Sequence, residues 1–342
     1  MLSTTRRSVL LAAVAATVAI ASASAQDSIT LKLAHPLPAT HYLWEQGAKT
    51  FTDAVTKDTE GKVKFEIYPA GQLGKDYLGL LKSGLADVVM LIPSYTPEKF
   101  PLTSVSELPG LYSTSCEATG KLWQLAKDGG LLNEKEYKPN SIHVLFVTTL
   151  APYKIMTVSK ETPTIDKIAG LKIRANGAAM DKTIRALGGV PVRITASDLY
   201  DALTRGTVDG SFYPFSGLPT YKLEKVFRYA IEGAQLGSGS VLFAMSEKGW
   251  NALPKNVRSA MAGASMAAQS SLCGWQDTEE TSIRDKIVAE DGFKVIDLSS
   301  EERKIWQDRV QTVGATWATE LDATGKKGTE VLKAFKDASN LQ

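Results

Sequence analysis

The sequence predicts an α/β fold of two doubly wound lobes with a cleft between them. Segments with the two-residue period of a strand alternate along the chain with segments of helical period, as in sheets covered by helices. The length of 342 residues suits about two domains. Residues 81–87 and 203–209 also share Leu, Gly and Asp at the same spacing, each as helix, glycine and strand. Together these observations favour two similar lobes.

The first 25 residues have the pattern of an export signal. Arg6-Arg7 precede an apolar run from Val9 to Ile20, and Ala23-Ser-Ala25 is a small-residue cleavage site. We therefore expect Gln26 to begin the mature protein. The apolar run is short for a membrane-spanning helix. The paired arginines fit both the general secretory route and the twin-arginine route.

The next part of the chain, up to about residue 150, is predicted to form the first lobe. Strands are expected at 29–33, 63–67, 86–91 and 142–148. The third of these is a nearly continuous apolar run, typical of a buried parallel strand. Helices ended by glycine are expected at 44–55, 78–82 and 118–127.

The second lobe repeats this order of elements. Gly170-Leu-Lys-Ile-Arg174 alternates as a strand, residues 177–187 follow as a helix, and further elements are expected at 190–192, 198–205 and 208–210. A strand at 240–245 then precedes a proline-free stretch from Ala262 to Val288, which predicts a long helix spanning both lobes. Glycines at 263 and 274 are its weak points. Amphipathic helix is expected over 301–335, broken near Gly325.

This order gives a provisional division of the chain. Lobe I is expected to contain 26–150 and about 240–279, and lobe II to contain 151–239 and about 280–342 with the C-terminal helices. Hinges are expected near Leu150-Ala151 and Gly237-Ser238, where the chain passes between lobes.

Composition excludes several classes of partner. The chain has 39 basic and 37 acidic residues, and the signal holds two arginines and no acid, so the mature net charge is zero. This argues against nucleic acid or an anionic membrane as the main partner. No later run of about 18 apolar residues occurs, so we expect no direct membrane insertion. Cys116 and Cys273 could form a disulfide in an oxidising compartment, but we favour two separate buried thiols.

Arg174 is the leading candidate for ligand binding. It ends a predicted strand and faces the start of a helix at Gly177, the place where ligands bind in open α/β sheets. Its guanidinium can make two parallel bonds to a carboxylate, and the helix N-terminus adds free N–H groups. The alternative is an arginine paired with a surface carboxylate.

Aromatic and histidine side chains supply the other candidates for the cleft. They are Tyr95, Tyr153, Phe212 and Tyr213 at or just after strand ends, with His41 and Trp44 near the first loop and helix. Core packing is the competing explanation for each aromatic residue. His35 and His41 lack metal-ligand spacing, and we favour capping or packing roles for them over a metal.

Motifs of catalysis are absent. The chain contains no G-x-S-x-G, no P-loop and no G-x-G-x-x-G, so we expect no catalytic residues, cofactor or metal. A secreted hydrolase with scattered catalytic residues stays open as an alternative, as does a binding protein of an ATP-driven or sensory system.

Seven short motifs occur in order along the chain: Leu33-Ala-His-Pro36, Tyr68-Pro-Ala-Gly-Gln-Leu-Gly74, Ser83-Gly-Leu-Ala-Asp87, Phe100-Pro-Leu102, Glu107-Leu-Pro109, Gly170-Leu-Lys-Ile-Arg174 and Gly206-Thr-Val-Asp-Gly210. This ordered set resembles the DctP-type solute-binding proteins of tripartite ATP-independent periplasmic (TRAP) transporters. The resemblance implies a bilobed periplasmic-binding-protein fold with a closing cleft. It also implies capture of an organic acid in the periplasm, delivery to a two-part membrane permease, and a carboxylate-binding role for Arg174.

Two departures from the family pattern bear on the ligand. Lys154 stands where the resemblance would place a second arginine, and Tyr213 stands where it would place an asparagine that binds carboxylate. Simple dicarboxylates and sialic acid are therefore doubtful. We expect a monocarboxylate with an aromatic or apolar body, held by Arg174 with Lys154 assisting. The alternative is a small hydroxy or oxo acid bound by the tyrosine hydroxyl.

Overall fold

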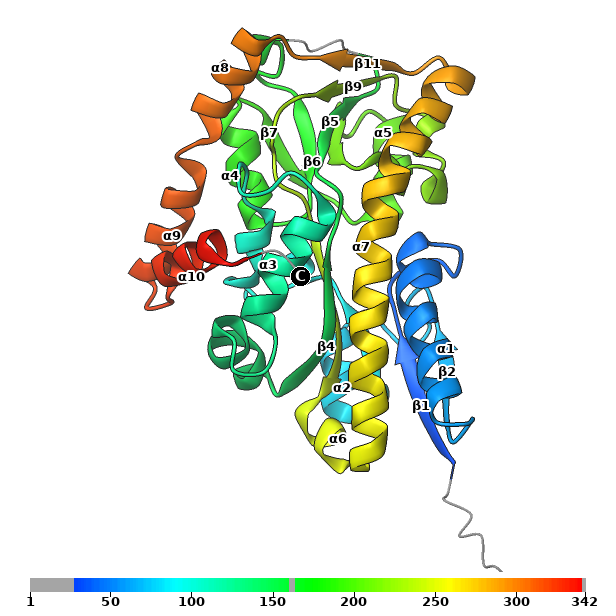
Figure 1. Cartoon of the computed structure of the whole chain (residues 1–342). Helices are drawn as coiled ribbons and strands as arrows, with labels where there is room; N and C mark the ends of the chain where they lie inside the picture. The colour runs from blue at the N-terminus through cyan, green and yellow to red at the C-terminus, as the bar shows by residue number, and fades with distance from the viewer. Residues whose placement is uncertain (1–27, 160–163, 340–342) are drawn as a thin grey trace, which may run out of the picture.

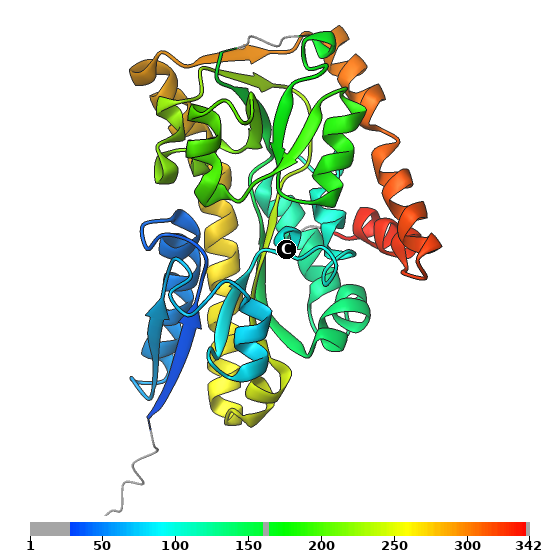
Figure 2. The same cartoon turned by 180° about the vertical axis from the view of Figure 1, so that it is seen from behind.

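Two mixed β-sheets form the framework of the two lobes, and helices cover them (Figures 1 and 2). The computed structural model describes residues 28–159 and 164–339. The expected export signal lies outside these residues. Within them, no helix is long and apolar enough to cross a membrane.

The first sheet has five strands in the order β2-β1-β3-β10-β4. β1 is parallel to β2 and β3, with Leu33 opposite Ile67, and β10 runs antiparallel between β3 and β4. Every residue of β3 and β4 is buried, which explains their continuous apolar sequence. The strands are β1 (Ile29–Ala34), β2 (Val63–Tyr68), β3 (Val88–Leu91), β4 (Ile142–Thr149) and β10 (Ser240–Ser246).

The helices that follow these strands cover the first lobe. They are η1 (Leu43–Ala48), α1 (Lys49–Asp58), α2 (Tyr77–Ser83), η2 (Pro93–Tyr95), η3 (Thr103–Glu107), α3 (Ser115–Ala126), η4 (Asn133–Tyr137), η5 (Lys138–Asn140) and α6 (Glu247–Ala252). Helix α2 ends at Gly84, whose positive φ of 75° lets the chain turn into β3 as the sequence predicts.

The second sheet has six strands in the order β11-β9-β5-β8-β6-β7. The strands are β5 (Lys154–Thr157), β6 (Lys172–Ala175), β7 (Val190–Arg193), β8 (Gly210–Tyr213), β9 (Tyr229–Glu232) and β11 (Lys294–Asp297). The helices are η6 (Ile165–Lys167), α4 (Ala178–Ala186), η7 (Ala196–Asp198), α5 (Leu199–Thr204), η8 (Phe215–Gly217), η9 (Pro219–Tyr221) and η10 (Leu223–Lys225). The sequence analysis predicted neither β9 nor β11; β11 lies at the edge of the sheet and none of its residues is fully buried, so its sequence lacks a buried apolar face.

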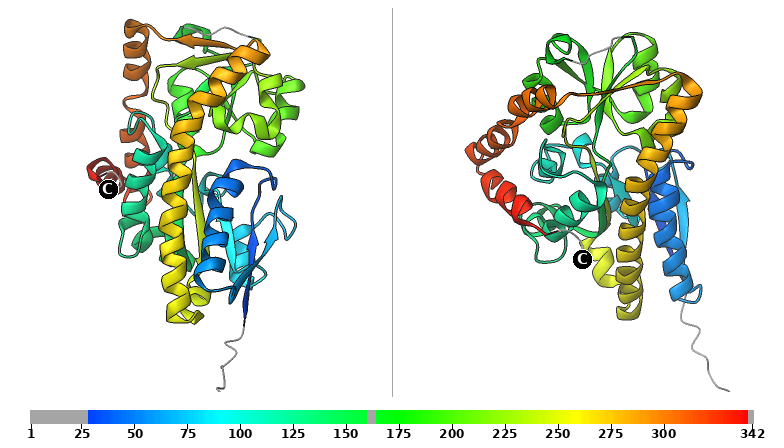
Figure 3. Two further views of the ribbon diagram at one scale, coloured as in Figure 1. Left: turned by 45° about the vertical axis from the view of Figure 1, so that its right-hand side comes forward. Right: turned by 45° about the horizontal axis from the view of Figure 1, so that its top comes forward.

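A long helix runs along both lobes, as predicted (Figures 1 and 3). α7 (Lys255–Asp291) has 37 residues, so it spans about 55 Å. Its buried residues recur at helical spacing, and a Cβ at Gly263 or Gly274 would meet nothing within 4 Å. Neither glycine is needed for close packing. The buried residues on one face of α7 are enough to keep the helix continuous at both positions.

The C-terminal helices lie against both lobes. They are α8 (Ser300–Val310), α9 (Val313–Ala323) and α10 (Gly328–Asp337). Helix α9 contacts α4, and α10 contacts α3. Trp317 Nε1 donates a hydrogen bond to Ser104 Oγ at 2.9 Å, which ties α9 to the first lobe. The division of the chain between lobes at about 150, 239 and 279 stays a prediction.

Cys116 and Cys273 form a disulfide, so the prediction of two separate thiols is wrong. Their Cα atoms lie 4.8 Å apart although 157 residues separate them in sequence. Asp277, one turn further along α7, accepts hydrogen bonds from the backbone N–H groups of Ser115 and Cys116 at 2.6 and 3.0 Å. The N-terminus of α3 is therefore held against α7, and this contact brings the cysteines together.

Two of the connections between the sheets, β4 to β5 and β9 to β10, lie side by side. Leu150 N–H donates to Gly239 O at 2.8 Å, and Tyr153 N–H donates to Gly237 O at 2.9 Å. These are the segments where hinges are expected from the sequence. Their role as hinges stays a prediction.

A buried carboxyl group lies where the lobes meet. Glu107, at the end of η3, is 1% exposed, and neither of its oxygens has a hydrogen-bond partner among the described residues. Burial raises the pKa of Glu107 to about 8. Asp181 of the second lobe raises it further, and Arg193 opposes the shift. The folded protein therefore holds Glu107 protonated at neutral pH.

Glu107 is expected to make the protein less stable as pH rises. The pKa of a glutamate carboxyl group is ordinarily 4.5, and that of Glu107 in the folded protein is about 8. Between these values folding binds a proton, so the free energy of unfolding falls with rising pH. Urea unfolding between pH 5 and 8 should show that the free energy of unfolding falls less steeply with pH in Glu107→Gln than in the wild type. Exposed Glu134, changed to Gln, is the control, and a wild-type slope in Glu107→Gln would contradict the assignment.

Candidate ligand-binding site

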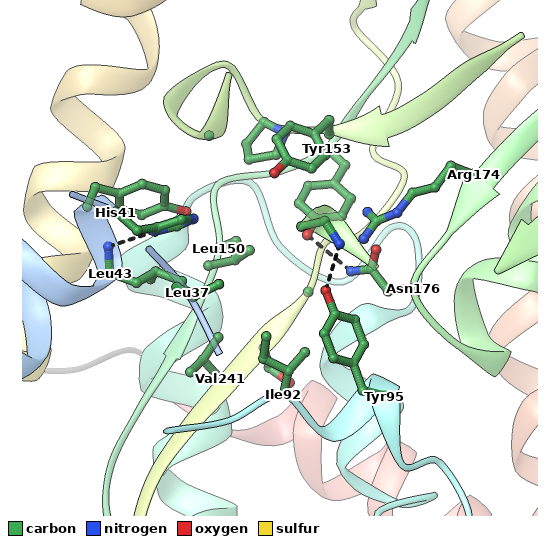
Figure 4. A pocket seen from close by; sticks show the side chains of 17 residues that line it. Leu37, His41, Leu43, Ile92, Tyr95, Leu150, Tyr153, Arg174, Asn176 and Val241 are labelled. Carbon is green, nitrogen blue, oxygen red and sulfur yellow. Dashed lines mark hydrogen bonds between the residues drawn. The ribbon is translucent and has the colours of Figure 1, made fainter. Parts of the chain in front are cut away.

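A pocket lies between the two lobes (Figure 4). Its volume is only ≈ 40 Å³, so a ligand that fits this conformation is small. Both lobes line it: Leu37, His41, Tyr42, Leu43, Ile92, Tyr95, Leu150, Tyr153, Arg174, Asn176, Ala196, Tyr213, Pro214, Gly217, Gly239, Ser240 and Val241.

Arg174 supplies the positive charge of the pocket. It lies on β6 and is 1% exposed. Its Nε donates to Ile194 O at 2.8 Å, while Nη1 has no hydrogen-bond partner among the described residues. The guanidinium carbon lies 5.8 Å from the centre of the Tyr213 ring. A buried cation with an unused donor is costly in the free protein, and an anionic ligand would relieve that cost.

Asn176 and Tyr153 lie beside the guanidinium. Asn176 Nδ2 donates to the Tyr153 hydroxyl at 3.3 Å, and Asn176 Oδ1 has no partner among the described residues. Because the two ends of an amide exchange by a simple rotation, Asn176 can offer a ligand either a donor or an acceptor. Burial raises the pKa of Tyr153 to about 12, against the opposing effect of Arg174. Its hydroxyl therefore stays protonated and can also donate.

Asn176 and Ser240 also line the pocket, and the sequence analysis missed both of them. Ser240, the first residue of β10, has a buried hydroxyl without a partner in the described parts of the chain. A usable signal for Asn176 exists, since it lies two residues after Arg174 at the point where the strand ends. Ser240 had no such signal, because only the folding of β10 between β3 and β4 brings it here.

The opposite end of the pocket is apolar. His41 faces Arg174 across the pocket, among Leu37, Leu150 and Val241 (Figure 4). Its Nδ1 accepts a hydrogen bond from Leu43 N–H at 3.1 Å, so Nε2 carries the proton of the neutral ring. Burial lowers the pKa of His41 to about 3. The histidine is therefore uncharged and adds no second cation to the site.

Tyr95, Tyr153, Arg174, Tyr213 and His41 thus line one pocket, and their role in binding a ligand stays a prediction. Three other predicted residues do not line it. Lys154 Nζ pairs with Glu280 Oε1 at 2.7 Å, so its charge is already neutralised. Phe212 is 0% exposed in the core, because neighbouring residues on β8 point to opposite faces of the sheet. Trp44 stacks on His35, with ring centres 5.2 Å apart.

Two α/β lobes that enclose a small pocket at their junction define a bilobed solute-binding protein. The chain matches the family model DctP, bacterial extracellular solute-binding protein family 7, over residues 33–320, and it belongs to that family. The resemblance inferred from the motifs is therefore confirmed. The C4-dicarboxylate-binding periplasmic protein DctP of Rhodobacter capsulatus is 28% identical over 339 residues, which cover 96% of this chain and 97% of that protein.

Solved structures show the same fold. A TRAP solute-binding protein from Rhodoferax ferrireducens, in complex with copurified benzoate, has a TM-score of 0.83 at 24% identity and covers 90% of this chain and 97% of that one. A second, from Bordetella bronchiseptica with bound (R)- and (S)-mandelate, has a TM-score of 0.81 at 22% identity, with coverages of 91% and 98%. A third, from Pseudomonas aeruginosa with bound L-malate, has a TM-score of 0.75 at 19% identity, with coverages of 84% and 99%.

Proposed function

We propose that this protein binds a small monocarboxylate with an aromatic or apolar body. The proposal rests on how charge is distributed in the pocket. Arg174 is the one cationic side chain among the lining residues, and the end of the pocket opposite Arg174 is apolar. One buried guanidinium with a free donor suits one carboxylate. A second carboxylate would meet Leu37, Leu150, Val241 and a neutral His41, where no positive charge compensates its desolvation.

The aromatic side chains around Arg174 support an aromatic body. The Tyr153 and Tyr213 rings lie 6.3 Å apart and nearly parallel. Burial raises the pKa of Tyr213 well above its usual range, so this ring stays neutral beside the ligand. Aromatic contacts add about 0.5–1.5 kcal/mol beyond the burial of area. Proteins of the same fold crystallised with benzoate and mandelate agree with this choice, whereas the malate complex represents the competing dicarboxylate class.

A panel of acids tests the ligand class. Benzoate, mandelate and benzoylformate are expected to raise the melting temperature of the mature protein, because a ligand that binds the native state stabilises it by mass action. Succinate and gluconate are expected to leave it unchanged. Mass spectrometry after incubation should recover each acid intact, whereas conversion would indicate an enzyme. Stabilisation by succinate or gluconate alone would exclude the proposed class.

We further propose that the protein acts in the periplasm and delivers its ligand to a two-part TRAP permease. Family membership and the export signal expected at residues 1–25 support this location. N-terminal sequencing of protein from the periplasmic fraction should begin at Gln26. Uptake of the labelled acid by cells should require this protein together with both permease subunits, and uptake without them would contradict the partnership.

A further inference from the structure

A second, larger cavity lies directly beyond the binding pocket. Its volume is ≈ 470 Å³, compared with ≈ 40 Å³ for the pocket around Arg174. Tyr77, Leu78 and Tyr221 contribute apolar surface to it, and the charged residues Lys75, Asp76 and Asp198 also line it. The outer cavity therefore has space and apolar surface for the body of a longer ligand.

Tyr95 forms part of the wall between the two cavities. Four residues line both of them: Leu37, Ile92, Tyr95 and Ala196. Tyr95 ends η2 in the first lobe, and its hydroxyl accepts a hydrogen bond at 3.1 Å from the N–H of Ala196, at the start of η7 in the second lobe (Figure 4). The Tyr95 side chain thus reaches across from one lobe to the other at the boundary of the pocket.

Close packing next to Tyr95 holds this wall in place. The preceding residue, Ser94, is 4% exposed. A Cβ added to Gly177, just before α4, would come within 2.8 Å of Ser94 Cβ and 3.1 Å of its carbonyl oxygen. The lobes meet here at van der Waals contact, with no spare space for the Tyr95 backbone to move toward Gly177. Because a shift of the backbone toward Gly177 is blocked, we expect removal of the Tyr95 side chain to be what joins the cavities.

We propose that Tyr95 is a specificity-determining residue that limits the length of the bound acid. With the carboxylate at Arg174, the Tyr95 ring closes the pocket against a body longer than a single ring. Without that ring, the body extends into the outer cavity. This inference rests on the proposed function, because it requires a carboxylate at Arg174.

Benzoate and 4-phenylbutyrate test the length limit by calorimetry, since they share a carboxylate and a ring and differ in length. The wild type should bind benzoate at least about tenfold more tightly than 4-phenylbutyrate. A difference of this size is typical when ligands that differ by methylene groups compete for one pocket. Tyr95→Ala should shift this ratio toward 4-phenylbutyrate by about tenfold or more. Tyr95→Phe keeps the ring and should keep the wild-type ratio.

Tyr77→Ala is the matched control, because Tyr77 lines the outer cavity alone and its loss should leave the ratio unchanged. If Tyr95→Ala does not fold, Tyr95→Leu makes the same test with a shorter apolar side chain. An unchanged ratio in the folded variant, with benzoate still bound by the wild type, overturns the length limit alone. A wild type that binds neither acid overturns the proposed function and this inference with it.

Discussion

Replacing Arg174 with alanine is expected to abolish binding of the acid while the protein stays folded. The guanidinium is buried, one of its nitrogens lacks a partner within the described chain, and it supplies the cationic group of the pocket. Loss of one partner from a buried, hydrogen-bonded charge pair costs about 2–5 kcal/mol. Calorimetry with benzoate should show this loss directly.

Two further variants separate the role of the guanidinium from that of charge. Arg174→Lys should also weaken binding strongly, because an ammonium group cannot reproduce the planar fork. Arg205→Ala should leave binding unchanged, since that side chain is 77% exposed and lies with Asp201 on the surface. Thermal unfolding of the ligand-free Arg174→Ala protein should change little, because the lost Nε–Ile194 bond is offset by removal of an uncompensated buried charge. Near-wild-type affinity in both Arg174 variants would remove this residue from the site.

Loss of the Cys116–Cys273 disulfide is expected to lower the free energy of unfolding by about 2–5 kcal/mol. The bond joins residues 157 apart in sequence, so its removal greatly enlarges the set of conformations open to the unfolded chain. Urea unfolding of the wild type with and without dithiothreitol should show the difference.

The variant with both cysteines changed to serine is the control for the reductant. It should unfold at the lower urea concentration whether or not dithiothreitol is present. Its ligand binding should persist, because Asp277 still accepts from the backbone of residues 115 and 116, and Gln276 donates to Thr148 Oγ1 at 2.8 Å. Equal stability of the oxidised and reduced wild type would contradict a stabilising role for the bond.

The sequence by itself determined the elements whose causes are local. Alternating and continuous apolar runs located β1, β2, β3 and β4, and the regular stripe of α7 outweighed its two glycines. Arg174 could be selected as a ligand-binding candidate for the same reason. The end of its strand and the start of the next helix are both evident within a few residues of the sequence. Tyr213 was selected as an aromatic residue at a predicted strand end, and the family resemblance then placed it where a carboxylate-binding asparagine would be.

Only the tertiary structure decided which distant residues meet. The Cys116–Cys273 bond depends on how α7 packs on α3, and the pairing of Lys154 with Glu280 spans 126 residues. Ser240 and Ala196 reach the pocket because β10 inserts between β3 and β4 and because the lobes touch at Tyr95. The spacing of apolar residues shows which face of a helix or strand is buried. Which other element packs against that face depends on contacts between residues far apart in the sequence. The charge, length and apolar end of the binding pocket are therefore properties of the folded chain.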